Sequence, residues 1–223
     1  MIVVENVKKN YGKQTVLGGV TFELYPQEVL ALMGPSGSGK TTLLRVVAGF
    51  EKPDGGRVCI DGIEVSSATH VAPPHKRKLS MVFQDLALWP HMTVEEHLEF
   101  VIRKNGMTKS AARDEIDRIL ECVCLEVFQG RYPHQLSGGE RQRLAIARSL
   151  ASSPSYLLMD EPFSNLDERL KEELQQLLLS LSQKTGIGTI YVTHNTREAF
   201  AVAKRVAFID QGVLLGIDDN RRL

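Results

Sequence analysis

Alternating apolar and polar residues predict three strands in the first 61 residues of the chain. The alternation is weak over 2–8, clear over 20–24, and present again over 57–61, between glycine-containing turns at 54–56 and 61–62. A period of two is typical of strands that bury one face. We therefore expect these segments to form an N-terminal antiparallel β-subdomain, packed beside the core of the fold.

Further apolar segments predict the strands of a central sheet. They lie at 29–33, 79–83, 156–159, 189–193, 206–210 and 213–217. The segment Tyr156-Leu157-Leu158-Met159 is continuously apolar, as expected for a strand that is buried on both faces of its sheet.

Helical spacing of apolar residues dominates the middle of the chain. Thr93-Val94-Glu95-Glu96 has the form of a capping box and predicts a helix toward Lys104, and a second helix is predicted over 110–123. A third helix begins near Ser137. Because no strand separates these helices, we expect an inserted helical subdomain over about 85–152.

Strands and helices alternate in the last third of the chain. Leucines share one side of a helix over 170–181, and Asn195-Thr196-Arg197-Glu198 caps another helix. There is no internal repeat, low-complexity tract or long linker. The whole pattern predicts an α/β fold with a mixed central sheet, in one domain that spans residues 1–223.

A glycine-rich segment follows the strand at 29–33 and leads into a helix. It consists of Gly34, Pro35, Ser36, Gly37, Ser38, Gly39, Lys40, Thr41 and Thr42. Strand, glycine loop and helix are the context that a phosphate-binding loop (P-loop) requires. Lys40 would reach the β- and γ-phosphates, and the Thr41 hydroxyl would bind Mg²⁺. The sequence therefore predicts the core of a P-loop NTPase, which binds a nucleoside triphosphate at the start of this helix.

Asp160-Glu161-Pro162 follows the buried strand at 156–159, at the edge where α/β sheets bind ligands. Neighbouring residues of an extended chain point to opposite sides. One carboxylate could therefore face the metal and the other the attacking water. We assign Asp160 to Mg²⁺, and Glu161 as the base or orienting group for water. The alternative is that Asp-Glu-Pro has only a structural role, as a turn that ends the strand.

A second glycine pair lies in Leu136-Ser137-Gly138-Gly139-Glu140. Ser137 and Glu140 fit a capping box for the helix that follows, which is a purely structural explanation. The two glycines cost backbone entropy and expose N–H groups, which favours a second anion site at the helix N-terminus. Because Lys40 already holds one γ-phosphate, this second site could serve the nucleotide of another molecule.

The order of these motifs resembles that of the nucleotide-binding subunit of an ATP-binding-cassette (ABC) transporter, from end to end. The matching segments are the P-loop at 34–41, Gln84 as the Q-loop glutamine, 136–140 as the signature, 156–161 as the Walker B strand, 164–167 as the D-loop, and His194 as the switch histidine. Members of this family hydrolyse ATP with Mg²⁺, and two such domains pair head to tail with two ATP molecules between them.

The resemblance implies roles for the remaining candidates. Ser137, Gly138, Gly139 and Glu140 would contact the γ-phosphate held by Lys40 of the other subunit. Asp167 would lie at the dimer seam, and His194 would contact the γ-phosphate.

Gln84 would contact the metal and the water. Tyr11 would stack on the adenine. Read locally, a histidine after a strand is more often structural, and Tyr11 could simply pack on the small sheet.

Three residues depart from the family pattern. Glu140 stands where Gln is common, Asn165 where Ala is common, and Asn195 where Asp is common. The Glu140 change preserves the helix cap, so we expect function to survive it. The sequence gives no account of the other two.

Composition and charge restrict the partners. The 27 basic residues balance the 27 acidic ones, so the chain shows no basic excess and we expect no nucleic-acid partner. Cys59, Cys122 and Cys124 have no metal-binding or disulfide spacing. With no signal peptide and no run of about 18 apolar residues, we expect a cytoplasmic chain that acts at the inner face of the membrane through partner subunits.

Residues 85–94 lie where the family receives a short helix of the membrane subunit, although they could instead fold onto their own helix. The sequence of this segment resembles that of ATPases of bacterial solute-import systems. We also expect that the chain has no C-terminal regulatory domain. The second ATPase of the dimer would be an identical chain or a different, paired ABC ATPase. The alternatives are an ATP-gated clamp without a membrane partner, which usually carries a coiled-coil insertion or two cassettes, and a small-molecule kinase, which would not need 136–140.

Overall fold

The computed structural model describes residues 1–103, 107–164 and 166–220. The strands are β1 (Ile2–Tyr11), β2 (Gln14–Leu24), β3 (Val29–Met33), β4 (Gly55–Ile60), β5 (Ile63–Ser67), β6 (Leu79–Val82), β7 (Tyr156–Asp160), β8 (Gly188–Thr193), β9 (Arg205–Asp210) and β10 (Val213–Asp219). The helices are α1 (Lys40–Ala48), α2 (Val94–Arg103), α3 (Lys109–Cys122), α4 (Gly138–Leu150), α5 (Glu168–Thr185) and α6 (Thr196–Val202), with short 3₁₀ turns η1 (Pro74–Lys76), η2 (Glu126–Phe128) and η3 (Pro133–Gln135).

The central sheet has the strand order β10-β9-β3-β8-β7-β6. The pairs from β9 to β6 are parallel, and β10 is antiparallel to β9. The sheet is therefore mixed, as predicted. Because parallel neighbours bring their carboxyl ends to one edge, the segments after β3, β6, β7 and β8 are gathered there.

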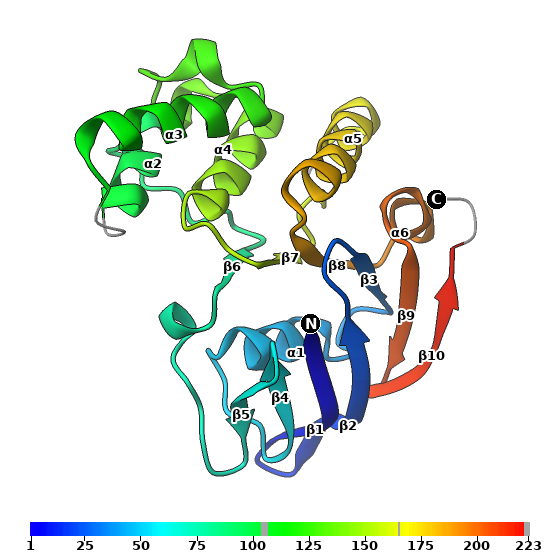
Figure 1. The fold of residues 1–223 in the computed structure, drawn as a ribbon. Helices are drawn as coiled ribbons and strands as arrows, with labels where there is room; N and C mark the ends of the chain where they lie inside the picture. Colours follow the sequence, from blue (N-terminus) through cyan, green and yellow to red (C-terminus); the bar gives the residue numbers. More distant parts are fainter. Residues whose placement is uncertain (104–106, 165, 221–223) are drawn as a thin grey trace.

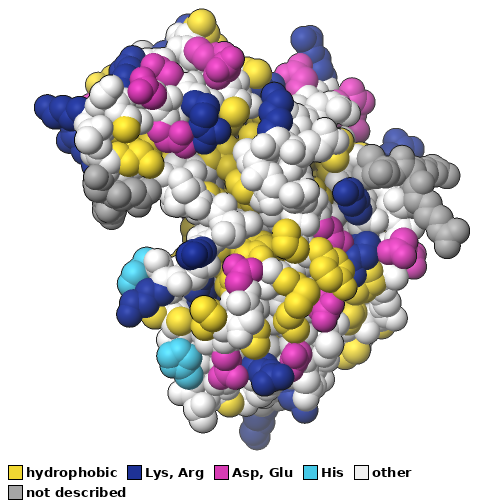
Figure 2. Space-filling view, in the orientation of Figure 1, with side chains coloured by type: hydrophobic (Ala, Val, Ile, Leu, Met, Phe, Trp, Pro, Cys, Tyr) yellow, Lys and Arg dark blue, Asp and Glu magenta, His cyan; other side chains and the backbone are white. Residues whose placement is uncertain are grey.

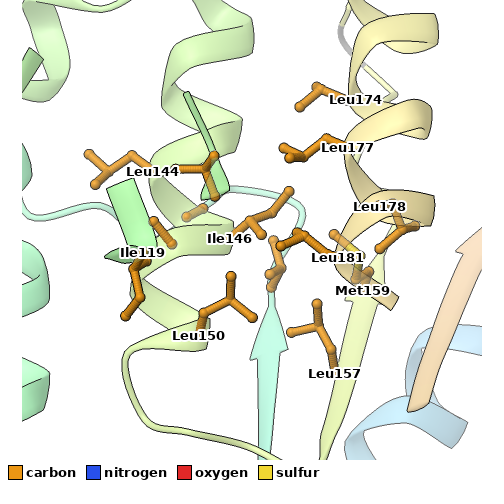
Figure 3. Packing of buried hydrophobic residues seen from close by; sticks show 14 of the residues in the cluster. Ile119, Leu144, Ile146, Leu150, Leu157, Met159, Leu174, Leu177, Leu178 and Leu181 are labelled. Carbon is orange, nitrogen blue, oxygen red and sulfur yellow. The ribbon is translucent and has the colours of Figure 1, made fainter. Parts of the chain in front are cut away.

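Side chains on the two faces of this sheet belong to two different hydrophobic cores. In β3, Val29 and Ala31 pack with the helices α2 to α6, whereas Leu30 and Leu32 pack with α1 and the antiparallel sheet. This double burial explains why the strand is apolar without alternation. Figure 3 shows one of the cores, where leucines of α4 and α5 meet Leu157 and Met159 of β7.

The second sheet is antiparallel, with the strand order β2-β1-β4-β5. The predicted α/β class, with an antiparallel sheet beside a mixed one, is confirmed. One boundary was wrong, because Gly55 and Gly56 lie inside β4 rather than in a turn before it. Gly56 has φ +74°, and a Cβ there would lie 2.2 Å from the Asn6 carbonyl oxygen, beside an irregularity in the β1–β4 register.

Helices α2, α3 and α4 follow β6 and lie together at one end of the molecule, with α5 beside them (Figure 1). Side chains of both charge signs are interspersed over the face seen in Figure 2, in keeping with the zero net charge. Within the described ranges, no helix combines the length and the apolar character needed to cross a bilayer.

Candidate nucleotide-binding site

The glycine loop joins β3 to α1, and its backbone is fixed by close contacts. A Cβ on Gly34 would lie 2.0 Å from the Ile209 carbonyl oxygen, and one on Gly39 would lie 2.7 Å from the Val16 carbonyl oxygen. Gly37 and Gly39 have φ values of +81° and +99°, which favour glycine. Gly39 is the N-cap of α1, so the first N–H groups of the helix face the loop.

Two polar side chains of the loop, Ser38 and Lys40, are buried, and they differ in their hydrogen-bond partners. The Ser38 hydroxyl is buried, and it is one of two side-chain polar atoms in the described residues that are buried without a hydrogen-bond partner. Lys40 is buried as well, and its Nζ donates to the carbonyl oxygens of Gly34 and Pro35, both at 2.8 Å. Burial lowers the pKa of Lys40, while the carboxylates of Glu161 and Asp160 act in the opposite direction. An anion in the loop would satisfy both side chains.

Thr41 and Asp160 form the candidate metal position. The Thr41 hydroxyl donates to Asp160 Oδ1 at 3.0 Å, which joins the start of α1 to the end of β7. Burial raises the pKa of Asp160, and the nearby charge of Glu161 also raises it, whereas the Thr41 hydrogen bond lowers it. A buried carboxylate beside a hydroxyl is a pair of hard oxygen donors, which fits Mg²⁺.

Glu161 adopts a conformation that differs from our expectation. Its φ is +46°, in the left-handed region, so the expected opposition of two carboxylates along an extended chain does not apply. The Glu161 N–H donates to the Val192 carbonyl oxygen at 3.1 Å, which ties the turn to β8. Non-glycine residues with positive φ are uncommon, and they concentrate at functional sites.

His194 follows β8 and lies beside Glu161, with His194 Nδ1 3.5 Å from Glu161 Oε1. It also lines a hollow of about 340 Å³ together with Gly34 and Pro35. The structure therefore gathers Lys40, Thr41, Asp160, Glu161 and His194 at the carboxyl edge of the central sheet.

The turn that carries His194 is held by Glu198 of α6. The buried Glu198 carboxylate accepts hydrogen bonds from Tyr191 and Thr193, and it forms an ion pair with Lys171 of α5 at 3.0 Å. Burial alone would raise the pKa of Glu198, but these partners outweigh it and lower the pKa. Sequence reasoning placed Glu198 only in a helix cap and missed its contacts with Tyr191, Thr193 and Lys171, since nothing local marks these partners.

Asn195 now has a structural account. Its side-chain oxygen accepts from the N–H groups of Arg197 and Glu198, which caps α6, and its Nδ2 lies 3.3 Å from Glu198 Oε1. An aspartate could cap the helix equally well, but it would place a second carboxylate against Glu198.

Gln84 lies after β6 and is exposed. It lines a cavity of about 260 Å³ with Gly138 and Gln142 of α4 and with Ser164. The buried Gln142 Nε2 is the second unpartnered polar atom of the described residues. Gln84 thus adjoins the turn after β7 and the start of α4 in this chain.

Residues 137–140 form the predicted helix start. The Ser137 hydroxyl accepts from the Glu140 N–H at 3.3 Å, and Glu140 Oε2 accepts from the Ser137 N–H at 2.7 Å. The glycines also have a packing reason that the sequence did not reveal. A Cβ on Gly139 would lie 2.9 Å from a methyl group of Leu170, and one on Gly138 would lie 3.3 Å from Leu166. Within the described residues, no hydrogen bond or ion pair joins 137–140 to 34–42.

Asp167 is the N-cap of α5 and accepts from the Leu170 N–H at 3.1 Å, and it is exposed. The predicted departure at Asn165 lies outside the described residues. Tyr11 ends β1, with 47% of its surface exposed. Its hydroxyl donates to the Glu51 carboxylate, a partner that the sequence did not suggest.

Residues 85–94 fold onto their own helix, which is one of the two possibilities that the sequence left open. Trp89 stacks on His97 at 5.4 Å and meets Phe100 edge-on at 5.1 Å, so it packs on its own helix. Beside it, a hollow of about 510 Å³ is lined by His91, Met92, Glu96, Glu99, Phe100 and Arg103. Arg148 of α4 donates to the Leu86 carbonyl oxygen at 2.8 Å and covers the Trp89 ring at 5.0 Å.

Comparison with known proteins finds relatives over the whole chain. The model of the family described as ABC transporter matches residues 17–164. The spermidine/putrescine import ATP-binding protein PotA of Chromobacterium violaceum is 43% identical over 223 residues, which are 100% of this chain and 61% of that protein. The sulfate/thiosulfate import ATP-binding protein CysA of Caulobacter vibrioides is 44% identical over 215 residues, which are 95% of this chain and 62% of that protein. The chain thus spans about three fifths of the length of these curated relatives.

Solved structures with the same fold include the dimeric structure of MJ0796, a bacterial ABC transporter cassette. It has a TM-score of 0.86 and 32% identity, and 99% of each chain is covered. The same cassette in a post-hydrolysis dimeric state bound to ADP and Pi also has a TM-score of 0.86, with 31% identity and the same coverage.

Proposed function

The chain belongs to the ABC transporter family, and we propose that it is an ATP-hydrolysing subunit that powers transport by closing and opening a head-to-tail dimer. The single observation that supports this best is the cluster of Lys40, Thr41, Asp160, Glu161 and His194 at one edge of the sheet. Lys40 binds the β- and γ-phosphates in this proposal, and Thr41 and Asp160 hold Mg²⁺. The ion would supply charge neutralisation at the phosphates.

Glu161 orients or deprotonates the attacking water, and His194 stabilises charge at the γ-phosphate. The 3.5 Å separation of their side chains supports a shared position for the reacting group. Gln84 completes the site from the helical side.

Residues 137–140 complete the site of a second subunit. In support, Ser137 is exposed, and its capping box presents the N-terminus of α4 to solvent. Gly139 also packs against Leu170, so the test of this proposal is the dimer itself.

The decisive variant is Glu161→Gln. We expect it to bind ATP, to hydrolyse it about 100-fold or more slowly, and to accumulate as a dimer on a sizing column with Mg²⁺ and ATP. The matched control is Glu172→Gln, an exposed residue of α5, which should behave as the parent chain does. A Glu161→Gln chain that stays monomeric with ATP would count against the shared site.

We further propose that the chain acts at the inner face of the membrane, where its partner is an integral subunit of an import system. The hollow lined by Met92, Glu96 and Phe100 supports this, because its lining combines apolar and charged side chains. Two relatives at 43% and 44% identity are named for the import of spermidine/putrescine and of sulfate/thiosulfate, which supports import as the direction of transport.

The test is co-purification from detergent-solubilised membranes. Phe100→Ala should reduce recovery of the membrane subunit and leave ATP hydrolysis by the isolated chain unchanged. Equal recovery of the membrane subunit with the parent chain and with Phe100→Ala would show that this hollow is not the docking site.

A further inference from the structure

Tyr11 is connected to the far end of the helix that begins at the phosphate loop. Its hydroxyl donates to Oε2 of Glu51, and Oε1 of Glu51 lies 3.7 Å from Nη1 of Arg45, in the last turn of α1. The Glu51 side chain is only 18% exposed. One carboxylate therefore links the end of β1 to the end of α1.

The position of Glu51 is set by the way that α1 ends. Gly49 caps the helix in the left-handed conformation with φ +85°, and the N–H groups of Phe50 and Glu51 both donate to the Arg45 carbonyl oxygen, at 2.9 and 3.3 Å. These bonds fix the direction of the chain after α1. The same helix that carries Lys40 at its start therefore positions Glu51 beside Tyr11 at its end.

A cation covers one face of the same ring. Nζ of Lys9 lies 5.4 Å from the Tyr11 ring centroid, and it donates to the Lys52 carbonyl oxygen at 2.8 Å. It also lies 3.9 Å from Asp54. A planar base can then stack only on the face of Tyr11 that Lys9 does not cover.

We propose that Glu51 is a positioning residue for nucleotide binding, which fixes the Tyr11 ring in the orientation that receives the base. The proposal rests on the proposed function as an ATP-hydrolysing subunit, and on the base-stacking role that the family resemblance implies for Tyr11. Arg45 holds the Glu51 carboxylate from the other side, and Lys9 decides which face of the ring is used. The ligand class is a nucleoside polyphosphate, because the anchored ring stacks on the flat base and the loop at 34–42 binds the phosphates.

Fixing the ring in advance reduces the loss of entropy on binding. An exposed tyrosine rotates about two side-chain bonds, and holding it costs part of the binding free energy. A net contribution of about 1 kcal/mol from one hydrogen bond corresponds to about a fivefold change in affinity. Burial and the Glu51 contact both raise the pKa of Tyr11, so the hydroxyl keeps the proton that it donates.

The test is a double-mutant cycle on MgADP affinity, measured by titration calorimetry. Tyr11→Phe and Glu51→Ala should each raise the Kd about fivefold, and the double variant should also show about fivefold rather than about 25-fold, because one bond is lost in every case. Glu51→Gln retains an acceptor and should stay within about twofold of the parent chain. Glu64→Ala, at an exposed acidic residue of β5, is the matched control and should leave the Kd unchanged.

A second titration uses inorganic tripolyphosphate, which has no base. Its Kd should be the same for the parent and for all these variants, and in steady-state assays Glu51→Ala should raise the KM for ATP without lowering kcat. Additive effects in the cycle, an unchanged MgADP Kd for Glu51→Ala, or an equal loss of tripolyphosphate affinity would each overturn the proposal.

Tyr11→Ala distinguishes the positioning role of Glu51 from the stacking role of Tyr11. If it weakens MgADP binding while Glu51→Ala does not, the positioning role is wrong and the stacking role of Tyr11 stands. If Tyr11→Ala has no effect, the stacking role is wrong, and the positioning role falls with it.

Discussion

The Thr41 hydroxyl donates a 3.0 Å hydrogen bond to the Asp160 carboxylate, although the two residues are 119 positions apart in the chain. This hydrogen bond joins the start of α1 to the end of β7. Thr41 and Asp160 are the two oxygen donors that would hold the proposed Mg²⁺.

Asp160→Asn tests this pair. Burial raises the pKa of Asp160, which means that its charge is unfavourable in the folded chain without metal. We expect the variant to lose Mg²⁺-dependent ATP hydrolysis by about 100-fold. In the absence of Mg²⁺ it should unfold at a slightly higher temperature than the parent chain.

The sign of the pH effect on Asp160 follows from the same shift. The raised pKa means that the folded chain holds the Asp160 proton more tightly than the unfolded chain does. The parent chain therefore becomes less stable as the pH rises from the ordinary carboxyl pKa through the raised one. The stability gap between Asp160→Asn and the parent should therefore widen between acidic and neutral pH. Thermal melts without Mg²⁺ across that range check it, and a gap that narrows contradicts it.

Lys40→Ala should reduce ATP hydrolysis about 100-fold or more, because it removes the only charge that the loop itself offers to the phosphates. The measurement is steady-state phosphate release at saturating Mg²⁺ and ATP. Lys109→Ala, at an exposed position that begins α3, makes the same charge change away from the site and should retain the parent rate. Near-normal turnover of Lys40→Ala would refute the phosphate-binding role.

Arg77 should be one of the most sensitive positions for stability. Its side chain is 1% exposed and donates to the carbonyl oxygens of Val46, Val47, Val65 and Ala72. Arg77→Met removes all of these buried hydrogen bonds, and only the Val46 and Val65 oxygens keep a backbone donor, from Gly49 and Ala72. We expect the loss to cost about 3 kcal/mol of unfolding free energy in urea titrations. Arg103→Met removes an exposed pair with Glu99 and should cost less than about 0.5 kcal/mol.

The Arg77 deficit should not change with pH near neutrality. Burial lowers the pKa of Arg77 to about 10, so the side chain is protonated in both the folded and the unfolded state near neutral pH. A deficit that varied between about pH 6 and pH 8 would show that a different group is responsible.

Asn195→Asp should lower stability by about 1 kcal/mol at neutral pH, because it replaces the donor to Glu198 with a like charge. The Glu198 pKa is already lowered by its partners, so its stabilising contribution exists above the ordinary glutamate pKa of about 4.3 and is lost as pH falls below it. Urea titrations at neutral and acidic pH should therefore give a deficit that shrinks on acidification. A deficit that grows would contradict this account.

The sequence by itself determined the elements and the local chemistry of this protein. Strand periodicity, continuous apolar runs, capping boxes and the glycine loop are properties of neighbouring residues, so they can be read without knowing the fold. Lys40 at the start of α1 and Ser137 as the N-cap of α4 were predicted on this basis, and the structure has them there.

Only the tertiary structure decided which distant groups meet. The left-handed turn at Glu161 depends on its bond to Val192, the packing of Gly139 depends on Leu170, and the anchoring of Tyr11 depends on Glu51. Each of these contacts joins separate elements, and their relative positions are set by burial on both faces of the central sheet. No local pattern encodes such distances, because many sequences with the same periodicity could pack with other neighbours.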